Sequence, residues 1–156
     1  MQSIINKETG SLYITDDFSV NSKTTLEELK TYFGLDRLEV EPAYKTYENA
    51  TLYDLKISDW YFVMTFYYNA GRLTHISFYP RDEEVNTASW DNFNPEADRD
   101  YYTNWMAAQL GDTKKFKWDL NQAGRHYSFS YPWGDIGVYY DFKGGTYSCI
   151  MGFKQK

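Results

Sequence analysis

Hydrophobic and polar side chains alternate in one run of the chain after another, and this period of two constrains the fold more than any other feature. Alternation of this kind is typical of strands that bury one face. Turn residues separate the runs, as in Asn69-Ala70-Gly71 and Gly144-Gly145, so successive strands are expected to pair as antiparallel hairpins. Pro80 is expected to end the strand that precedes it. The expected strands are Leu52–Ile57, Trp60–Tyr68, Leu73–Tyr79, Lys114–Trp118, Arg125–Tyr131, Asp135–Phe142 and Thr146–Phe153.

Two segments have a helical period instead. Thr24 is the expected N-cap of a helix over Thr25–Phe33, and Glu27 can complete a capping box with it. Asn94 is the expected cap of a second helix over Pro95–Leu110, because proline fits the first helical position. A glycine follows each helix, which is the usual stop signal.

These elements predict an α+β fold, in which an antiparallel sheet of six to eight strands carries two helices on one face. Ser3–Ile5 and Ser11–Ile14 add a short N-terminal hairpin. Each helix precedes a run of strands, which suggests a helix-plus-β-meander unit used twice. No linker divides the chain, so residues 1–156 are expected to form a single domain. The predicted core residues are Phe62, Phe66, Ile76, Phe78, Trp105, Phe129, Val138 and Ile150.

The charge balance limits the partners. Sixteen Lys and Arg stand against 22 Asp and Glu, a net charge of −6. An acidic protein repels phosphate backbones, so nucleic-acid binding is disfavoured, whereas a basic protein partner is attracted. No stretch approaches the roughly 20 apolar residues of a membrane span, and the N-terminus has no signal-peptide pattern. We therefore expect no membrane association and a cytoplasmic location.

Catalytic and cofactor motifs are missing from the sequence. It has no phosphate-binding glycine loop and no Gly-x-Ser-x-Gly elbow. Cys149 is the only cysteine, and His75 and His126 lie far apart, so no zinc-binding spacing exists. Cys149 is expected to be a small buried hydrophobe. Asp135 and Asp141 could act on a glycoside only if their carboxylates converged. The sequence predicts no enzyme, no metal and no cofactor.

A predicted binding surface comes from one loop and one turn. Residues 81–94 form a long loop that places an acidic run near aromatic side chains, and long loops are often functional. A tryptophan at the turn after Pro132 can offer a partly exposed ring to a partner, or fold back over the sheet edge. The predicted partner-binding residues are Asp82, Glu83, Glu84, Trp90 and Trp133.

Aromatic residues make up 20% of the chain. Most are expected to fill the core or to form cross-strand pairs, because rings pack well on a pleated sheet. Exposed rings instead suit two kinds of recognition. A patch rimmed by acids favours a protein partner, and a groove of parallel rings favours carbohydrate or another small ligand. A closed pocket would favour an enzyme of unrecognised type.

The C-terminal stretch resembles the ending of small bacterial immunity proteins encoded beside polymorphic toxins. The residues that carry the resemblance are Trp133-Gly134-Asp135-Ile136, Tyr140-Asp141, Gly144-Gly145 and Ser148-Cys149-Ile150. The repeated helix-plus-meander order is also similar to that of proteinaceous enzyme inhibitors with tandem α/β repeats. The resemblance implies a non-enzymatic inhibitor that binds one toxin, for which a basic toxin domain would be a suitable partner.

Overall fold

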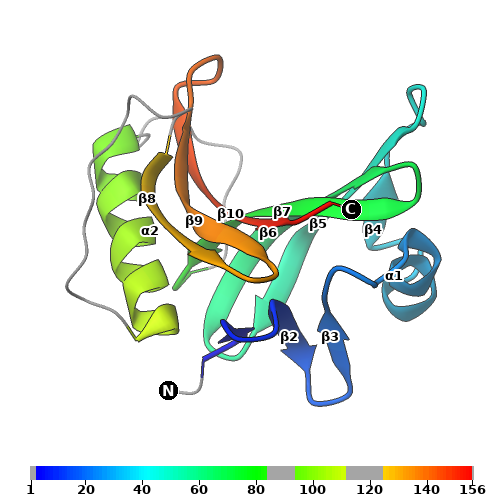
Figure 1. Ribbon diagram of the computed structural model, residues 1–156, viewed down its shortest axis with the longest axis horizontal. Coiled ribbons are helices and arrows are strands. Elements are labelled where there is room, and N and C mark those ends of the chain that lie inside the picture. The colour runs from blue at the N-terminus through cyan, green and yellow to red at the C-terminus, as the bar shows by residue number, and fades with distance from the viewer. Residues whose placement is uncertain (1–2, 84–93, 112–124, 156) are drawn as a thin grey trace.

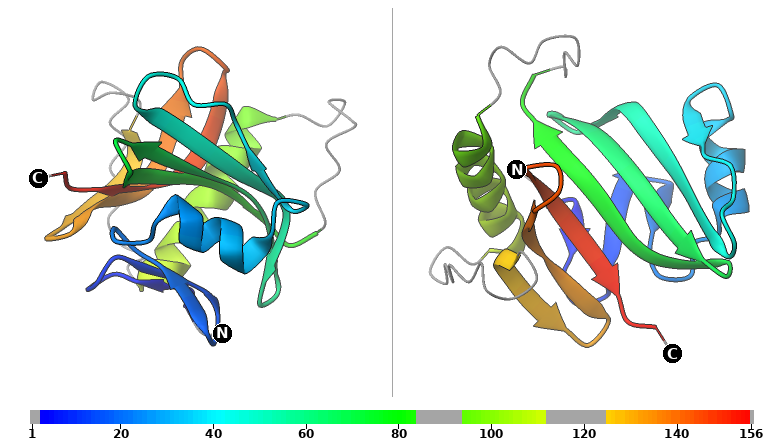
Figure 2. Two further views of the ribbon diagram at one scale, coloured as in Figure 1. Left: turned by 90° about the vertical axis from the view of Figure 1, so that its right-hand side faces the viewer. Right: turned by 90° about the horizontal axis from the view of Figure 1, so that it is seen from above.

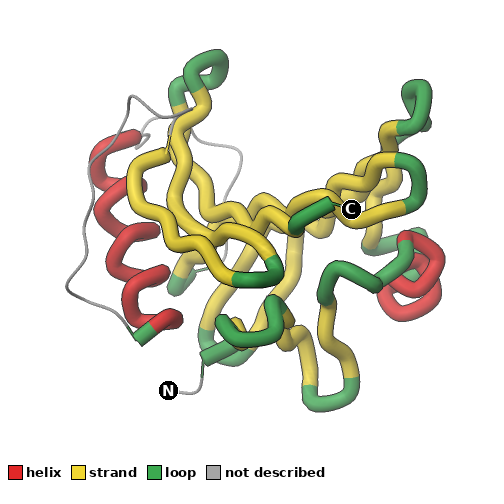
Figure 3. The backbone as a smooth tube through the Cα atoms, in the orientation of Figure 1, coloured by secondary structure: helices red, strands yellow, loops and turns green. Residues whose placement is uncertain are grey.

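The computed structural model describes residues 3–83, 94–111 and 125–155, which contain two helices and two antiparallel sheets (Figures 1 and 3). The helices are α1 (Leu26–Phe33) and α2 (Pro95–Leu110). The smaller sheet has the order β1-β2-β3, and its strands are β1 (Ile5–Asn6), β2 (Ser11–Thr15) and β3 (Phe18–Val20). The larger sheet comprises β4 (Leu38–Val40), β5 (Tyr47–Ile57), β6 (Trp60–Asn69), β7 (Arg72–Arg81), β8 (Arg125–Tyr131), β9 (Gly134–Asp141) and β10 (Thr146–Phe153).

The larger sheet consists of two meanders. Its strand order is β4-β5-β6-β7-β10-β9-β8, so every pair of neighbours is consecutive in sequence except β7 and β10. Helix α1 precedes the first meander and α2 precedes the second. The predicted α+β class, the antiparallel sheet of six to eight strands and the repeated helix-plus-meander order are confirmed.

One face of the larger sheet is buried. Met64, Phe78, Cys149 and Val138 pair in a single row across β6, β7, β10 and β9, and all four are fully buried. Paired residues of neighbouring strands point to the same face, so this row marks the centre of the core. The expectation that Cys149 is a buried hydrophobe agrees with its place in the row.

Both helices and the smaller sheet cover this face. The Trp105 ring of α2 lies 5.9 Å from Phe62 and 5.7 Å from Phe78, centroid to centroid. At the start of α1, the Tyr68 hydroxyl of β6 donates to the Thr24 carbonyl at 2.8 Å. The view from above in Figure 2 shows strands of the larger sheet in front of the N-terminal strands, with α1 at the side of the sheet.

The cap of α1 lies one residue later than predicted. Thr25, not Thr24, is the N-cap, and Glu28 rather than Glu27 completes the capping box. The Thr24 side chain is buried instead, where its hydroxyl accepts from the Asn21 N–H at 3.0 Å. Two adjacent threonines followed by two adjacent glutamates fit the motif equally well, and burial decides between them. Helix α2 has the predicted limits, with Asn94 as its cap.

Several strand limits differ from the prediction. β7 continues through Pro80 to Arg81, and Pro80 pairs with Phe62. Proline is tolerated there because β10 pairs with β7 only up to Phe78, so the absent N–H interrupts no bond on that side. β5 begins at Tyr47, five residues before its predicted start, and β9 ends at Asp141. The sequence did not predict β3 or β4, and the expected strand over 114–118 lies outside the described residues.

Two predicted core residues are less buried than expected. Ile150 pairs with Ser77 and Gly137 on the opposite face of the sheet and is only half-buried. Its apolar neighbours in sequence, Cys149 and Met151, take the core positions instead. Phe129 is half-buried and packs against the edge of the core. The remaining predicted core residues are buried: Phe62, Phe66, Ile76, Phe78, Trp105 and Val138.

Candidate partner-binding surfaces

Asp82 and Glu83 lie exposed directly after β7, near the first half of α2. Arg81 anchors this end of the strand, because its guanidinium lies 3.1 Å from the Asp98 carboxylate. Burial, and then the negative charge of nearby Asp82, raise the pKa of Tyr101 on the same helix. The two exposed acids therefore occupy the junction between β7 and α2.

Trp133 folds back over the sheet edge at the turn between β8 and β9. Its indole Nε1 donates to the Lys7 carbonyl at 2.7 Å, and its ring stacks on Tyr131 with the planes 7° apart. Gly10 lies against the ring so closely that a Cβ there would come within 2.5 Å of it. The half-buried indole thus links the N-terminal hairpin to the larger sheet.

The structure does not bring the described residues of the predicted surface together. Asp82 lies beyond the β7 end that pairs near Cys149, whereas Trp133 lies beside Gly134, which pairs with Phe153 at the other end of β10. With about 3.3 Å of rise per strand residue, the two positions are roughly 25 Å apart. Glu84 and Trp90 lie outside the described residues. A role for these residues in partner binding stays a prediction.

The face of the larger sheet opposite the core carries half-buried aromatic and polar side chains. Tyr67 stacks on His75 with ring centroids 4.2 Å apart and planes 10° apart. Desolvation lowers the pKa of His75, and desolvation followed by the charge of Asp141 raises the pKa of Tyr67. Charges of both signs rim this face, among them Glu39 and Lys56. Because this face carries charges of both signs, it favours neither an acidic nor a basic partner.

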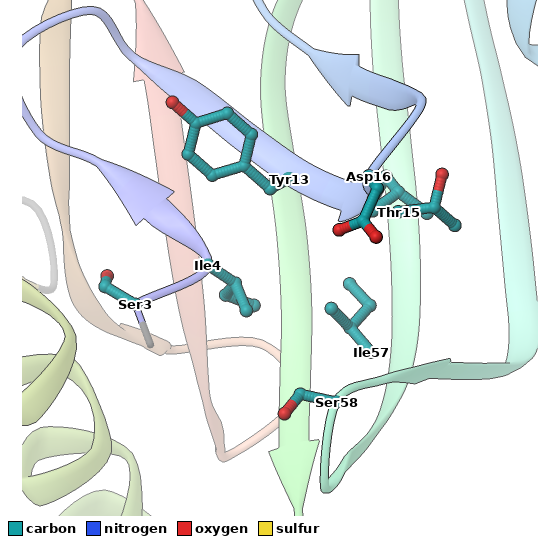
Figure 4. A pocket seen from close by; sticks show the side chains of 8 residues that line it. Ser3, Ile4, Tyr13, Thr15, Asp16, Ile57 and Ser58 are labelled. Carbon is teal, nitrogen blue, oxygen red and sulfur yellow. The ribbon is translucent and has the colours of Figure 1, made fainter. Parts of the chain in front are cut away.

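Two hollows flank the β2–β3 hairpin. The first, of about 620 Å³, lies between the smaller sheet and the β5–β6 turn (Figure 4). Its buried residues include Ile4 and Ile57, and Tyr13, Asp16 and Ser58 are exposed around it. In Figure 4 the Asp16 carboxylate points toward the space above Ile57.

The second hollow, of about 510 Å³, lies between β3 and α1, and it combines aromatic rings with carboxylates. Its lining residues are Phe18, Glu27, Glu28, Thr31 and Tyr32. Sequence reasoning assigned no binding role to the residues of either hollow. The density of acids near the N-terminus was the available signal, but nothing in the sequence placed α1 beside β3.

Neither Cys149 nor the pair Asp135 and Asp141 is placed for the chemistry considered from the sequence. Burial raises the pKa of the Cys149 thiol well above its ordinary value, which disfavours the nucleophilic thiolate. Asp135 and Asp141 are six residues apart on one strand, or roughly 20 Å, which exceeds the spacing of about 5–9.5 Å between glycosidase carboxylates. Among residues 3–83, 94–111 and 125–155, no three His, Cys, Asp or Glu side chains gather where they could hold a metal ion.

No helix in these ranges is both long and apolar enough to cross a membrane.

The comparisons with known proteins give one informative likeness. No family model matches the sequence, and no curated protein matches it. A chain of the solved complex "Rhs1-CT in complex with cognate immunity protein RhsI1" has a similar fold, with a TM-score of 0.52 and 15% sequence identity. The match covers 96% of this chain and 86% of that chain. The likeness shows a shared fold with a chain of this toxin–immunity complex, which agrees with the resemblance inferred from the C-terminal residues.

Proposed function

We propose that this protein is a non-enzymatic immunity protein, which binds a toxin domain and inhibits it. The observation that carries the proposal is the likeness in fold to a chain of a toxin–immunity complex over almost the whole length. An inhibitor of this kind needs a stable surface and no catalytic groups. The buried Cys149 thiol and the wide spacing of Asp135 and Asp141 are compatible with that requirement.

The net charge of −6 supports a basic partner. Opposite charges speed the encounter of two proteins and disfavour wrong partners. The exposed acids Asp82 and Glu83 belong to the contact that the sequence predicts, and Trp133 is the further predicted position within the described residues. Because the Trp133 indole already bonds to Lys7, its contribution would come from the exposed part of its ring.

Binding and protection are the two properties to test. The partner would be sought among the genes that flank this one, and a toxin domain found there would be expressed with and without the protein while growth of the host cells is followed. We expect growth only when the protein is present. Isothermal titration calorimetry of the purified pair should give a one-to-one complex. A toxin domain from an unrelated locus serves as the control and should not bind.

Failure of protection together with failure of binding would contradict the proposal. If the neighbouring toxin domain kills cells whether or not this protein is present, and the purified proteins do not associate, the protein is not its immunity protein. Binding to an oligosaccharide, or turnover of a substrate, would favour the carbohydrate-binding or enzymatic alternatives. Glu83→Lys and Trp133→Ala test the predicted surface, which is wrong if neither changes the affinity beyond about 0.5 kcal/mol.

A further inference from the structure

Negative charge is concentrated near the N-terminus. Residues 8–36 contain six acids and two bases, a net charge of −4 within a chain whose total is −6. One of the two bases, Lys30, forms an ion pair with Glu27 at 3.0 Å. The Glu27 side chain is nevertheless 80% exposed. The acids are Glu8, Asp16, Asp17, Glu27, Glu28 and Asp36.

An exposed aromatic stack lies within this charged region. The Tyr32 ring of α1 stacks on the Phe18 ring of β3, with centroids 4.0 Å apart and planes 7° apart. Tyr32 remains 42% exposed, and both rings line the second hollow with Glu27 and Glu28. A cation near an aromatic ring is attracted to its face, and neighbouring carboxylates strengthen that attraction.

The two hollows belong to one continuous surface. The Thr15 and Tyr32 hydroxyls are hydrogen-bonded at 2.9 Å, which joins the outer side of β2 to α1. Thr15 lines the first hollow and Tyr32 lines the second. Asp16 and Asp17 form the tip of the hairpin between them and are exposed. We name the residues that line the two hollows, together with Asp17, the acidic hairpin surface.

We propose that the acidic hairpin surface docks a segment of the toxin that carries lysine or arginine side chains. The inference rests on the proposed function and assigns a contact surface separate from the one that the sequence predicts at Asp82, Glu83 and Trp133. One basic side chain would occupy the hollow beside Tyr32, between Glu27 and Glu28. A second would reach Asp16 in the hollow on the other side of the hairpin. Charge complementarity supports this occupant, because the surface carries four carboxylates, those of Asp16, Asp17, Glu27 and Glu28, beside the exposed ring of Tyr32.

The test compares charge reversals at matched exposed acids. The double variant Asp16→Lys/Glu27→Lys reverses charge at both hollows, and Tyr32→Ala removes the exposed ring. The double variant Glu39→Lys/Glu41→Lys, at two exposed acids in and beside β4, is the matched control because it reverses the same number of charges. Affinity for a toxin domain encoded beside the gene would be measured by calorimetry at about 50 and about 300 mM salt, roughly threefold below and twofold above the physiological ionic strength of about 0.15 M. Circular dichroism would verify that each variant is folded.

We expect the double variant to weaken binding at least about a hundredfold and Tyr32→Ala about tenfold, in the range of interface hot spots. Glu39→Lys/Glu41→Lys should stay within about twofold of the wild type, as expected of neutral surface positions. The wild-type affinity should fall with salt, and the double variant should lose much of that dependence. If the folded double variant and Tyr32→Ala bind like the wild type, this surface is not the docking site, although the proposed function stands. If the wild type does not bind at all, both proposals fail.

Discussion

Phe78 lies fully buried in the middle of β7, where its ring contacts those of Phe62 and Trp105. Phe78→Ala would leave a cavity between the sheet and α2, and we expect it to lower the free energy of unfolding by about 3–5 kcal/mol. Urea denaturation measures this loss. Tyr53→Ala, at a half-exposed ring on β5, is the control and should change stability much less. An unchanged melting temperature for Phe78→Ala would contradict the assigned core.

His75 makes stability depend on pH. Desolvation lowers its pKa in the folded protein below the ordinary 6.5, so the unfolded chain binds the proton more tightly. The resulting stabilisation is complete above the unfolded pKa and is lost as the pH falls through 6.5 toward the folded value. We expect the free energy of unfolding to drop between pH 7.5 and 5.5. The drop should be smaller in His75→Gln, and an identical profile in that variant would refute the assignment. His126, whose pKa is also lowered, should account for part of the remainder.

At the scale of an element, α1 depends on its cap. The Thr25 hydroxyl accepts from the Glu28 N–H at 3.1 Å, and the Glu28 carboxylate accepts from the Thr25 N–H at 3.2 Å. Thr25→Ala removes the first bond and should destabilise the protein by about 1 kcal/mol. Thr31→Ala, at an exposed position inside the helix, is the control for loss of a threonine side chain. If both variants melt at the same temperature, the cap contributes nothing measurable.

Elements with a strong local signal could be predicted from the sequence, and those held by distant contacts could not. The limits of α2 follow from Asn94, Pro95 and Gly111, because cap, first turn and stop are all local. β3 and β4 have three residues each, too few to display an alternation. The first residues of β5 are Tyr47-Glu48-Asn49, which resemble a loop in composition and become a strand by pairing with β6. These segments form strands because they pair with neighbouring strands, and not because of their local sequence.

The candidate site was harder to predict for the same reason. The turn around Trp133 was recognisable, but the Lys7 carbonyl that binds its indole lies 126 residues away in the chain. Likewise, Asp16 and Tyr32 are unremarkable in sequence, and only the packing of α1 against β3 makes them neighbours of one surface. A surface composed of separate elements leaves no periodic signal in any one of them.

At the scale of the whole molecule, Trp133 connects the first residues of the chain to its second half. Trp133→Phe keeps a ring but removes the bond to the Lys7 carbonyl. We expect faster amide hydrogen exchange in β1 and β2, because local opening of the hairpin becomes easier. Exchange in β6, which lies between β5 and β7 inside the larger sheet, is the internal reference. Unchanged protection of β1 and β2 would show that the hairpin is held by its other contacts, such as that between Ser3 and Gln109.

The joint between β7 and β10 has a kinetic consequence. In this strand pair Phe78 is paired with Cys149, 71 residues later in the chain. Every other strand pair in the larger sheet joins strands that follow each other in the chain. Local hairpins close quickly, and contacts across long loops are slower because more chain entropy is lost before they form. Each meander can therefore assemble early, and their union across β7 and β10 is expected to limit the folding rate. Until that union forms, both strands expose an unpaired edge, and the unfinished chain is most open to aggregation during this interval.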